Sequence, residues 1–216
     1  MRHVPNDKYT IAWFKLAECI AKGEKEKAFG VYRLLRHSLD DQAYAYRLEG
    51  DLLDAFHDTG ATEKYAQAAH LYYASKRYKE ASSLYEELVA LEPKNEAYFS
   101  RLMELYRAIP SLAARKTKFD ALLVLCKEKR YFSRAVIVVA HLHECSPVDE
   151  IIHSYCELIP LVGDPQTEDG ISILNAALAY LKSMNDVAQT DHFFDYLQQI
   201  GGAWHAQALQ MVGRTE

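Results

Sequence analysis

Small residues recur at fixed places between large apolar ones in the stretch from Tyr65 to Pro93, YAQAAHLYYASKRYKEASSLYEELVALEP. Apolar residues three and four positions apart share one face of a helix, so this spacing predicts two helices. Proline disfavours helix at the residue before it, which places the end of the second helix at Glu92. A small residue between aromatic ones lets another helix approach closely. The stretch therefore predicts two closely packed antiparallel helices.

The same periodicity continues along nearly the whole chain of 216 residues, with short breaks. Glycine (9) and proline (6) are scarce, which argues against an all-β fold because its turns need them. Short links favour antiparallel neighbours. The expected fold class is all-α, an α–α superhelix of stacked antiparallel helical hairpins. We expect about twelve helices, at 8–22, 24–37, 41–57, 61–75, 78–91, 95–108, 111–129, 131–144, 149–159, 168–183, 186–199 and 202–212.

One pattern of apolar and small residues occurs twice. It reads Tyr65, Ala68, Ala69, Tyr72, Ala81, Tyr85, Leu88 and Pro93, and again Phe119, Leu122, Leu123, Cys126, Ala135, Val139, Leu142 and Pro147. This resembles the tetratricopeptide repeat (TPR), a helix–turn–helix unit of about 34 residues. Other starts lie at Trp13, Tyr46 and Phe99. The prediction is TPR-like repeats at 1–149, and divergent repeats or a helical capping bundle at 150–216, continuous with the first part.

The spacing of these starts is irregular. Some steps are one helix long and others two, so helices 61–75 and 111–129 each fit the first or the second place in a pair. We expect small residues at the closest helix contacts, namely Ala17, Gly50, Ala69 and Ala81. One such hairpin cannot bury its apolar face alone, whereas stacked hairpins share a continuous core. An open stack leaves its end faces partly uncovered, which permits dimerisation through an end helix.

The resemblance implies a function in protein binding. TPR proteins typically bind an extended peptide or a helix of a partner in a concave groove, lined mainly by the first helices of the pairs. Carried onto this chain, the groove positions are Ala66, His70, Tyr73, Ser100, Glu104, Arg107, Asp120, Val124 and Lys127. Their mixed character predicts recognition by hydrogen bonds and modest charge pairing, with aromatic anchors. One subset of the family holds a C-terminal carboxylate with Lys and Asn, but Phe14 and Glu18 stand there, so chaperone tails are not expected.

Charge and composition constrain the partner and the compartment. The formal net charge of −5 makes nucleic acid an unlikely partner. Basic clusters at 76–79, 115–118 and 127–130 are expected to be solvated helix faces, and a nucleic-acid-binding helical repeat is the alternative. No stretch has the length and apolarity of a membrane span or a secretory signal. Four cysteines within helical patterns predict reduced thiols in a cytoplasmic protein.

Catalytic motifs are missing from the sequence. It has no glycine-rich phosphate loop, no Gly-x-Ser-x-Gly, no His-Glu-x-x-His and no Cys-x-x-Cys, so we expect a non-enzymatic scaffold or adaptor without a cofactor. The second alternative is a zinc site at His141, Cys145, His153 and Cys156, because each pair shares one face of its helix. Packing is the favoured role for the cysteines, and Cys19 and Cys126 are expected in the core.

Overall fold

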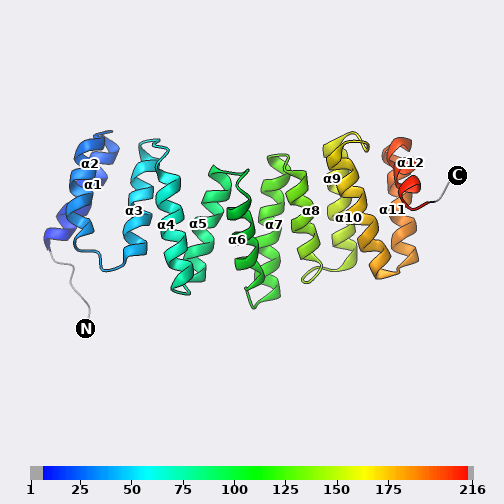
Figure 1. The fold of residues 1–216 in the computed structure, drawn as a ribbon, viewed down its shortest axis with the longest axis horizontal. Coiled ribbons are helices and arrows are strands. Elements are labelled where there is room, and N and C mark those ends of the chain that lie inside the picture. Colours follow the sequence, from blue (N-terminus) through cyan, green and yellow to red (C-terminus); the bar gives the residue numbers. More distant parts are fainter. Residues whose placement is uncertain (1–6, 214–216) are drawn as a thin grey trace. The chain divides into compact units, whose positions relative to one another are not determined.

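The chain is built from helices alone in the part that the structure describes. This computed structural model describes residues 7–213, with side chains from residue 10 onward. The helices are α1 (Asp7–Ala21), α2 (Lys25–Arg36), α3 (Gln42–Ala55), α4 (Ala61–Ala74), α5 (Tyr78–Leu91), α6 (Glu96–Arg107), α7 (Leu112–Glu128), α8 (Phe132–Leu142), α9 (Val148–Val162), α10 (Glu168–Met184), α11 (Val187–Ile200) and α12 (Gly202–Met211) (Figure 1). The predicted all-α class of antiparallel helical hairpins is confirmed.

The helices form two compact units. Unit 1 spans Met1–Ala108 and unit 2 spans Ile109–Glu216. In unit 1, α4 packs against both α3 and α5, and α6 packs against α5. In unit 2, α7 packs on α8, α8 on α9 and α10, and α9 on α11. The predicted division at 149/150 falls within the first turn of α9, a helix that packs against α8. The loss of repeat character beyond it stays a prediction from sequence.

Helix boundaries follow local chemistry. Asp41, Asn95 and Ser111 each accept a hydrogen bond from a backbone N–H in the first turn of α3, α6 and α7. Helix α5 ends at Leu91, two residues before Pro93, as predicted. The predicted bounds agree with the structure closely, and the largest difference is at the end of α9.

Helix α9 continues past the predicted end at 159. The stretch from Pro160 onward was expected to be irregular, and Pro160 itself has no N–H for the carbonyl of Cys156. The structure keeps Pro160 inside the helix, which ends at Val162 before Gly163 with φ of +87°. The Tyr196 hydroxyl donates to the Cys156 oxygen at 2.8 Å and replaces the missing bond. The irregular stretch expected from 160 onward is therefore shorter.

Small residues mark the close contact of α3 with α4. A Cβ atom on Gly50 would lie 2.6 Å from Cδ1 of Tyr65, so only glycine admits that ring. Ala69 and Ala81 are fully buried, which confirms their predicted places. Ala17 was wrongly predicted, because it is exposed. Its face of α1 is not the one with buried Leu16, which packs toward α2.

The core follows the predicted pattern in both units. All the apolar and small residues of the two pattern copies are buried, and only the terminal prolines are not. In the second half of unit 2 the core continues with Ile173, Leu174, Ala177, Leu181, Phe193, Leu197, Trp204 and Ala208. Shared apolar faces of this kind are what hold a stack of helical hairpins together.

Candidate functional site

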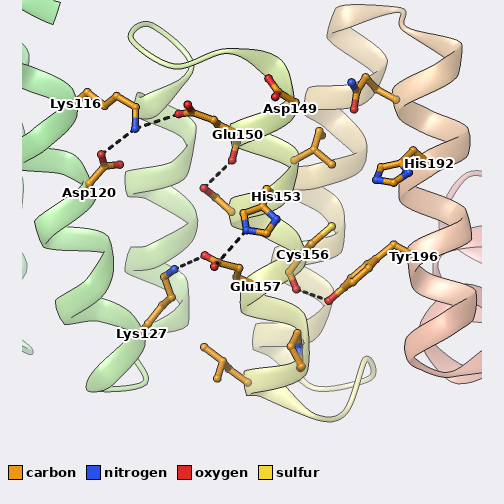
Figure 2. A pocket seen from close by; sticks show the side chains of 15 residues that line it. Lys116, Asp120, Lys127, Asp149, Glu150, His153, Cys156, Glu157, His192 and Tyr196 are labelled. Carbon is orange, nitrogen blue, oxygen red and sulfur yellow. Dashed lines mark hydrogen bonds and ion pairs between the residues drawn. The ribbon is translucent and has the colours of Figure 1, made fainter. Parts of the chain in front are cut away.

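A long groove crosses three alternate helices of unit 2. It has a volume of about 1150 Å³ and is lined by side chains of α7, α9 and α11 (Figure 2). We call it the α7–α9–α11 groove. Its size lies above the upper end of most small-molecule pockets, which are about 300–1,000 Å³. Because α8 and α10 pack behind these helices, the groove presents every second helix to solvent.

Ion pairs connect α7 with α9 across one side of the groove. The Lys116 ammonium lies 2.9 Å from Asp120 and 3.0 Å from Glu150. The Lys127 ammonium lies 2.6 Å from Glu157 (Figure 2). The hydrogen bonds that Lys116 donates to Asp120 and Glu150 raise its pKa, and the hydrogen bond that Lys127 donates to Glu157 lowers the pKa of Glu157. The ammonium groups of both lysines are thus already paired with carboxylates of the chain itself.

Tyrosine and histidine line the other side. Tyr196 of α11 reaches the backbone of α9 through its hydroxyl, and burial raises its pKa. His153 is largely exposed and lies 3.4 Å from Glu157, and His192 of α11 is also exposed (Figure 2). Rings with a polar edge at an open groove are suited to contacts with another protein.

The base of the groove is apolar. Ile152 and Cys156 are buried on the inner face of α9, and Pro160 and Leu161 extend this surface at the end of the helix. Burial raises the pKa of the Cys156 thiol to about 12, so it stays protonated at neutral pH. A thiol in that state packs as a small apolar group and is a poor nucleophile.

The structure places the nine predicted groove residues in different surroundings. Asp120 and Lys127 line the α7–α9–α11 groove, and Val124 is exposed between them on α7. Ala66 and His70 line a smaller groove of about 510 Å³ in unit 1, beside Gln42 and Tyr46 of α3.

The other four predicted residues line neither groove. Tyr73 lies under the Arg101 guanidinium, at 4.6 Å from the ring centroid, and packs edge-on against Tyr78. The remaining three are exposed on α6, namely Ser100, Glu104 and Arg107. Glu104 pairs with Arg101 at 2.6 Å.

Sequence reasoning missed the contributions of α9 and α11. The repeat signature fades after about residue 150, so no groove positions were carried beyond Lys127. The order of the predicted helices could have indicated them. If every second helix lines the groove, the helices that follow α7 on that face are α9 and α11. Glu150, His153 and Glu157 also share one helical face by their spacing of three and four.

The four residues of the proposed zinc site do not come together. The ring of His141 stacks on Phe119, and Cys156 is buried against Tyr196 of α11. His153 points into the groove beside Glu157. Among residues 7–213, no three His, Cys, Asp or Glu side chains are placed to hold one metal ion.

The basic clusters are largely engaged within the chain. Arg77 pairs with Asp41 and Glu80, and its guanidinium lies over the ring of Tyr72. Arg115 donates to the carbonyl of Ile109 and pairs with Glu144 at 2.7 Å. The Arg130 guanidinium donates to the Leu161 carbonyl. These three arginines are thus committed to contacts within the chain.

Comparison with known proteins adds little. The fold and the groove define the class, an all-α helical-repeat protein with a groove across alternate helices. No protein-family model matches the chain, and no curated protein is similar to it. Among solved structures, BtubC (BKLC) from P. vanneervenii is similar at 16% sequence identity and a TM-score of 0.46, over 79% of this chain and 78% of that chain.

No helix among residues 7–213 has the length and apolarity needed to cross a membrane.

Proposed function

We propose that the chain is a TPR-like, non-enzymatic scaffold or adaptor that binds a peptide or helix of a partner protein in the cytoplasm. The observation that carries this proposal is the α7–α9–α11 groove. It is long, has an apolar base and polar sides, and is formed by every second helix. The binding groove of stacked helical pairs is formed in the same way.

The side chains of the groove are suited to a protein segment. Aromatic and apolar groups give contact area, while the ion-paired side chains surround them with polar groups. An apolar centre with a polar border is the common arrangement at protein–protein interfaces. The engagement of the basic clusters supports this reading over nucleic-acid binding, for which several free cations in a row are needed.

Affinity capture from native lysate tests the proposal. The bait is the purified chain, with and without nuclease, at two salt concentrations, and the captured proteins are identified by mass spectrometry. His192→Trp places a large ring in the groove, whereas Gln198→Trp places one on an exposed position of α11 that does not line it. The two variants are matched for helix and exposure.

We expect the native chain and Gln198→Trp to retain the same few proteins through nuclease and moderate salt. His192→Trp should reduce their recovery about tenfold or more, as loss of a central contact does. Equal recovery with the two variants would contradict the proposal that partners bind in the α7–α9–α11 groove. Captured proteins that are lost after nuclease treatment would instead favour nucleic acid as the partner.

A further inference from the structure

The two ends of the α7–α9–α11 groove differ in chemistry. Helix α9 runs along it, with Asp149 and Glu150 in its first turn and Pro160 and Leu161 in its last. At a rise of 1.5 Å per residue, the distance along α9 from residue 149 to residue 161 is about 18 Å. One end is therefore acidic and the other apolar, and the segment between them is long enough for about six extended residues.

Carboxylates exceed cations in the groove. Its lining contains Asp120, Asp149, Glu150 and Glu157, but only two lysines. Both lysines are already paired, Lys116 with two of these carboxylates and Lys127 with one. The side of the groove formed by α11 contributes only Gln189, His192 and Tyr196. A negative potential thus remains after the internal pairs are counted.

Asp149 is the carboxylate most available to a partner. It is exposed, and its side chain makes no ion pair or hydrogen bond with any residue in the part of the chain that is described. Glu150 shares its lysine and keeps 49% of its side-chain surface exposed. Two carboxylates on adjacent residues at one end of a groove complement the charge of a Lys or Arg side chain.

The apolar end provides a different contact. Leu161 keeps 39% of its surface exposed, and Pro160 beside it is also exposed. The backbone carbonyl of Leu161 is bound by Arg130, which fixes this end of α9. A large apolar side chain laid against the two residues would remove their surface from water.

We propose that the groove binds a basic protein segment, with Lys or Arg at Asp149 and Glu150 and a large apolar side chain at Pro160 and Leu161. This proposal rests on the proposed function and adds the charge and the polarity of the partner. Phosphate groups and acidic segments would meet the same carboxylates and be repelled. The occupant is thus a short basic and apolar stretch of another protein.

Selection of displayed peptides tests the partner's chemistry. A library of random peptides of about twelve residues is selected on the purified full chain and counter-selected on His192→Trp. Enriched peptides are synthesised with a fluorophore, and their affinities are measured by fluorescence polarisation. Asp149→Lys reverses the charge at the proposed contact with Lys or Arg of the peptide. Glu168→Lys is the matched control, because Glu168 lies in the first turn of α10 and lines no part of the groove.

We expect enriched peptides to carry Lys or Arg about five or six positions from a large apolar residue. Asp149→Lys should weaken them about tenfold, Asp149→Asn less, and Glu168→Lys by less than about twofold. Groove-dependent peptides that are acidic, or that ignore Asp149→Lys, would overturn this inference and leave the proposed function standing. If no enriched peptide depended on the groove, the proposed function would be overturned as well.

Discussion

Units 1 and 2 have similar apolar cores but differ in how some of their carboxylates are bound. In unit 1, buried tyrosines bind two of them, Tyr32 binding Glu49 at 3.1 Å and Tyr106 binding Glu86 at 2.9 Å. In unit 2, lysines bind them on an open surface, as Lys127 does with Glu157. A carboxylate bonded to a buried hydroxyl is committed to the fold, whereas one over a groove stays accessible to a partner. We therefore expect substitutions at the close contacts of unit 1 to change stability most, and substitutions in the α7–α9–α11 groove of unit 2 to change binding most.

The largest effect is expected in the closely packed part of unit 1. Ala81 is completely buried in α5, so Ala81→Leu adds carbon atoms where there is no space. We expect a loss of about 1–3 kcal/mol in the free energy of unfolding. Ala90→Leu, at an exposed position of the same helix, should change it by less than about 0.5 kcal/mol. Urea unfolding measures both, and equal stabilities would mean that the packing of α5 is misplaced.

Two glycines give the next comparison. Gly50→Ala brings a methyl group against Tyr65 and should destabilise the protein by about 1–2 kcal/mol, after the gain in helix propensity is subtracted. Gly30→Ala in α2 meets nothing within 4 Å and should stabilise it by about 0.5–1 kcal/mol. Thermal and urea unfolding should move in opposite directions. A stabilising Gly50→Ala would contradict the close approach of α3 and α4.

In unit 2, the bond that supports Pro160 is expected to matter moderately. Tyr196→Phe leaves the Cys156 carbonyl without its donor and should cost about 1 kcal/mol. In a Pro160→Ala background the new backbone N–H can bind that carbonyl, so the same substitution should cost less. A double-mutant cycle in urea measures the difference. Additive costs would show that the hydroxyl does not replace the missing helix bond.

The predicted partner-binding residues of α4 in unit 1 are expected to contribute less to binding than the α7–α9–α11 groove of unit 2. His70→Ala combined with Tyr73→Ala should leave the circular dichroism of the chain unchanged and lower partner capture about threefold. His192→Trp should lower it more. The recovery of each captured protein is compared by quantitative mass spectrometry. A greater loss with the double variant would move the main site to unit 1.

The smallest expected effect is on acid stability. Lys127 lowers the folded-state pKa of Glu157, so the pair stabilises the fold above the pKa of an unfolded carboxyl group, which is about 4.3. This stabilisation is lost as the pH falls through the lowered pKa. Urea unfolding from about pH 7 to about pH 3 should show the difference between native chain and Lys127→Met disappearing in acid. Lys129→Met, at an exposed position, is the control and should show no such trend.

Much of the fold was predictable because it depends on local rules. Apolar periodicity and the capping residue Asp41 place helices without any knowledge of distant contacts. The end of α9 was not predictable in this way, since it depends on Tyr196, which lies forty residues away in the sequence. Ala17 was misjudged for a related reason, because a small residue fits both a close contact and an exposed face.

The candidate site was predictable only in part. Asp120 and Lys127 were named from the repeat pattern, because α7 still carries it. Tyr196 and His192 were not, because α11 lies where the pattern has faded. A sequence also does not show which charged side chains are unpaired. Lys116 is paired in the structure because Asp120 of α7 and Glu150 of α9 lie beside it.

The central claim is that partners bind in the α7–α9–α11 groove, and site-specific photo-crosslinking tests it most directly. A photo-reactive amino acid replaces His192 in one sample and Gln198 in another, and each purified chain is irradiated in native lysate. We expect crosslinks to the same few proteins from the position of His192 and none from that of Gln198. Crosslinks of equal yield from both positions, or from neither, would contradict the claim.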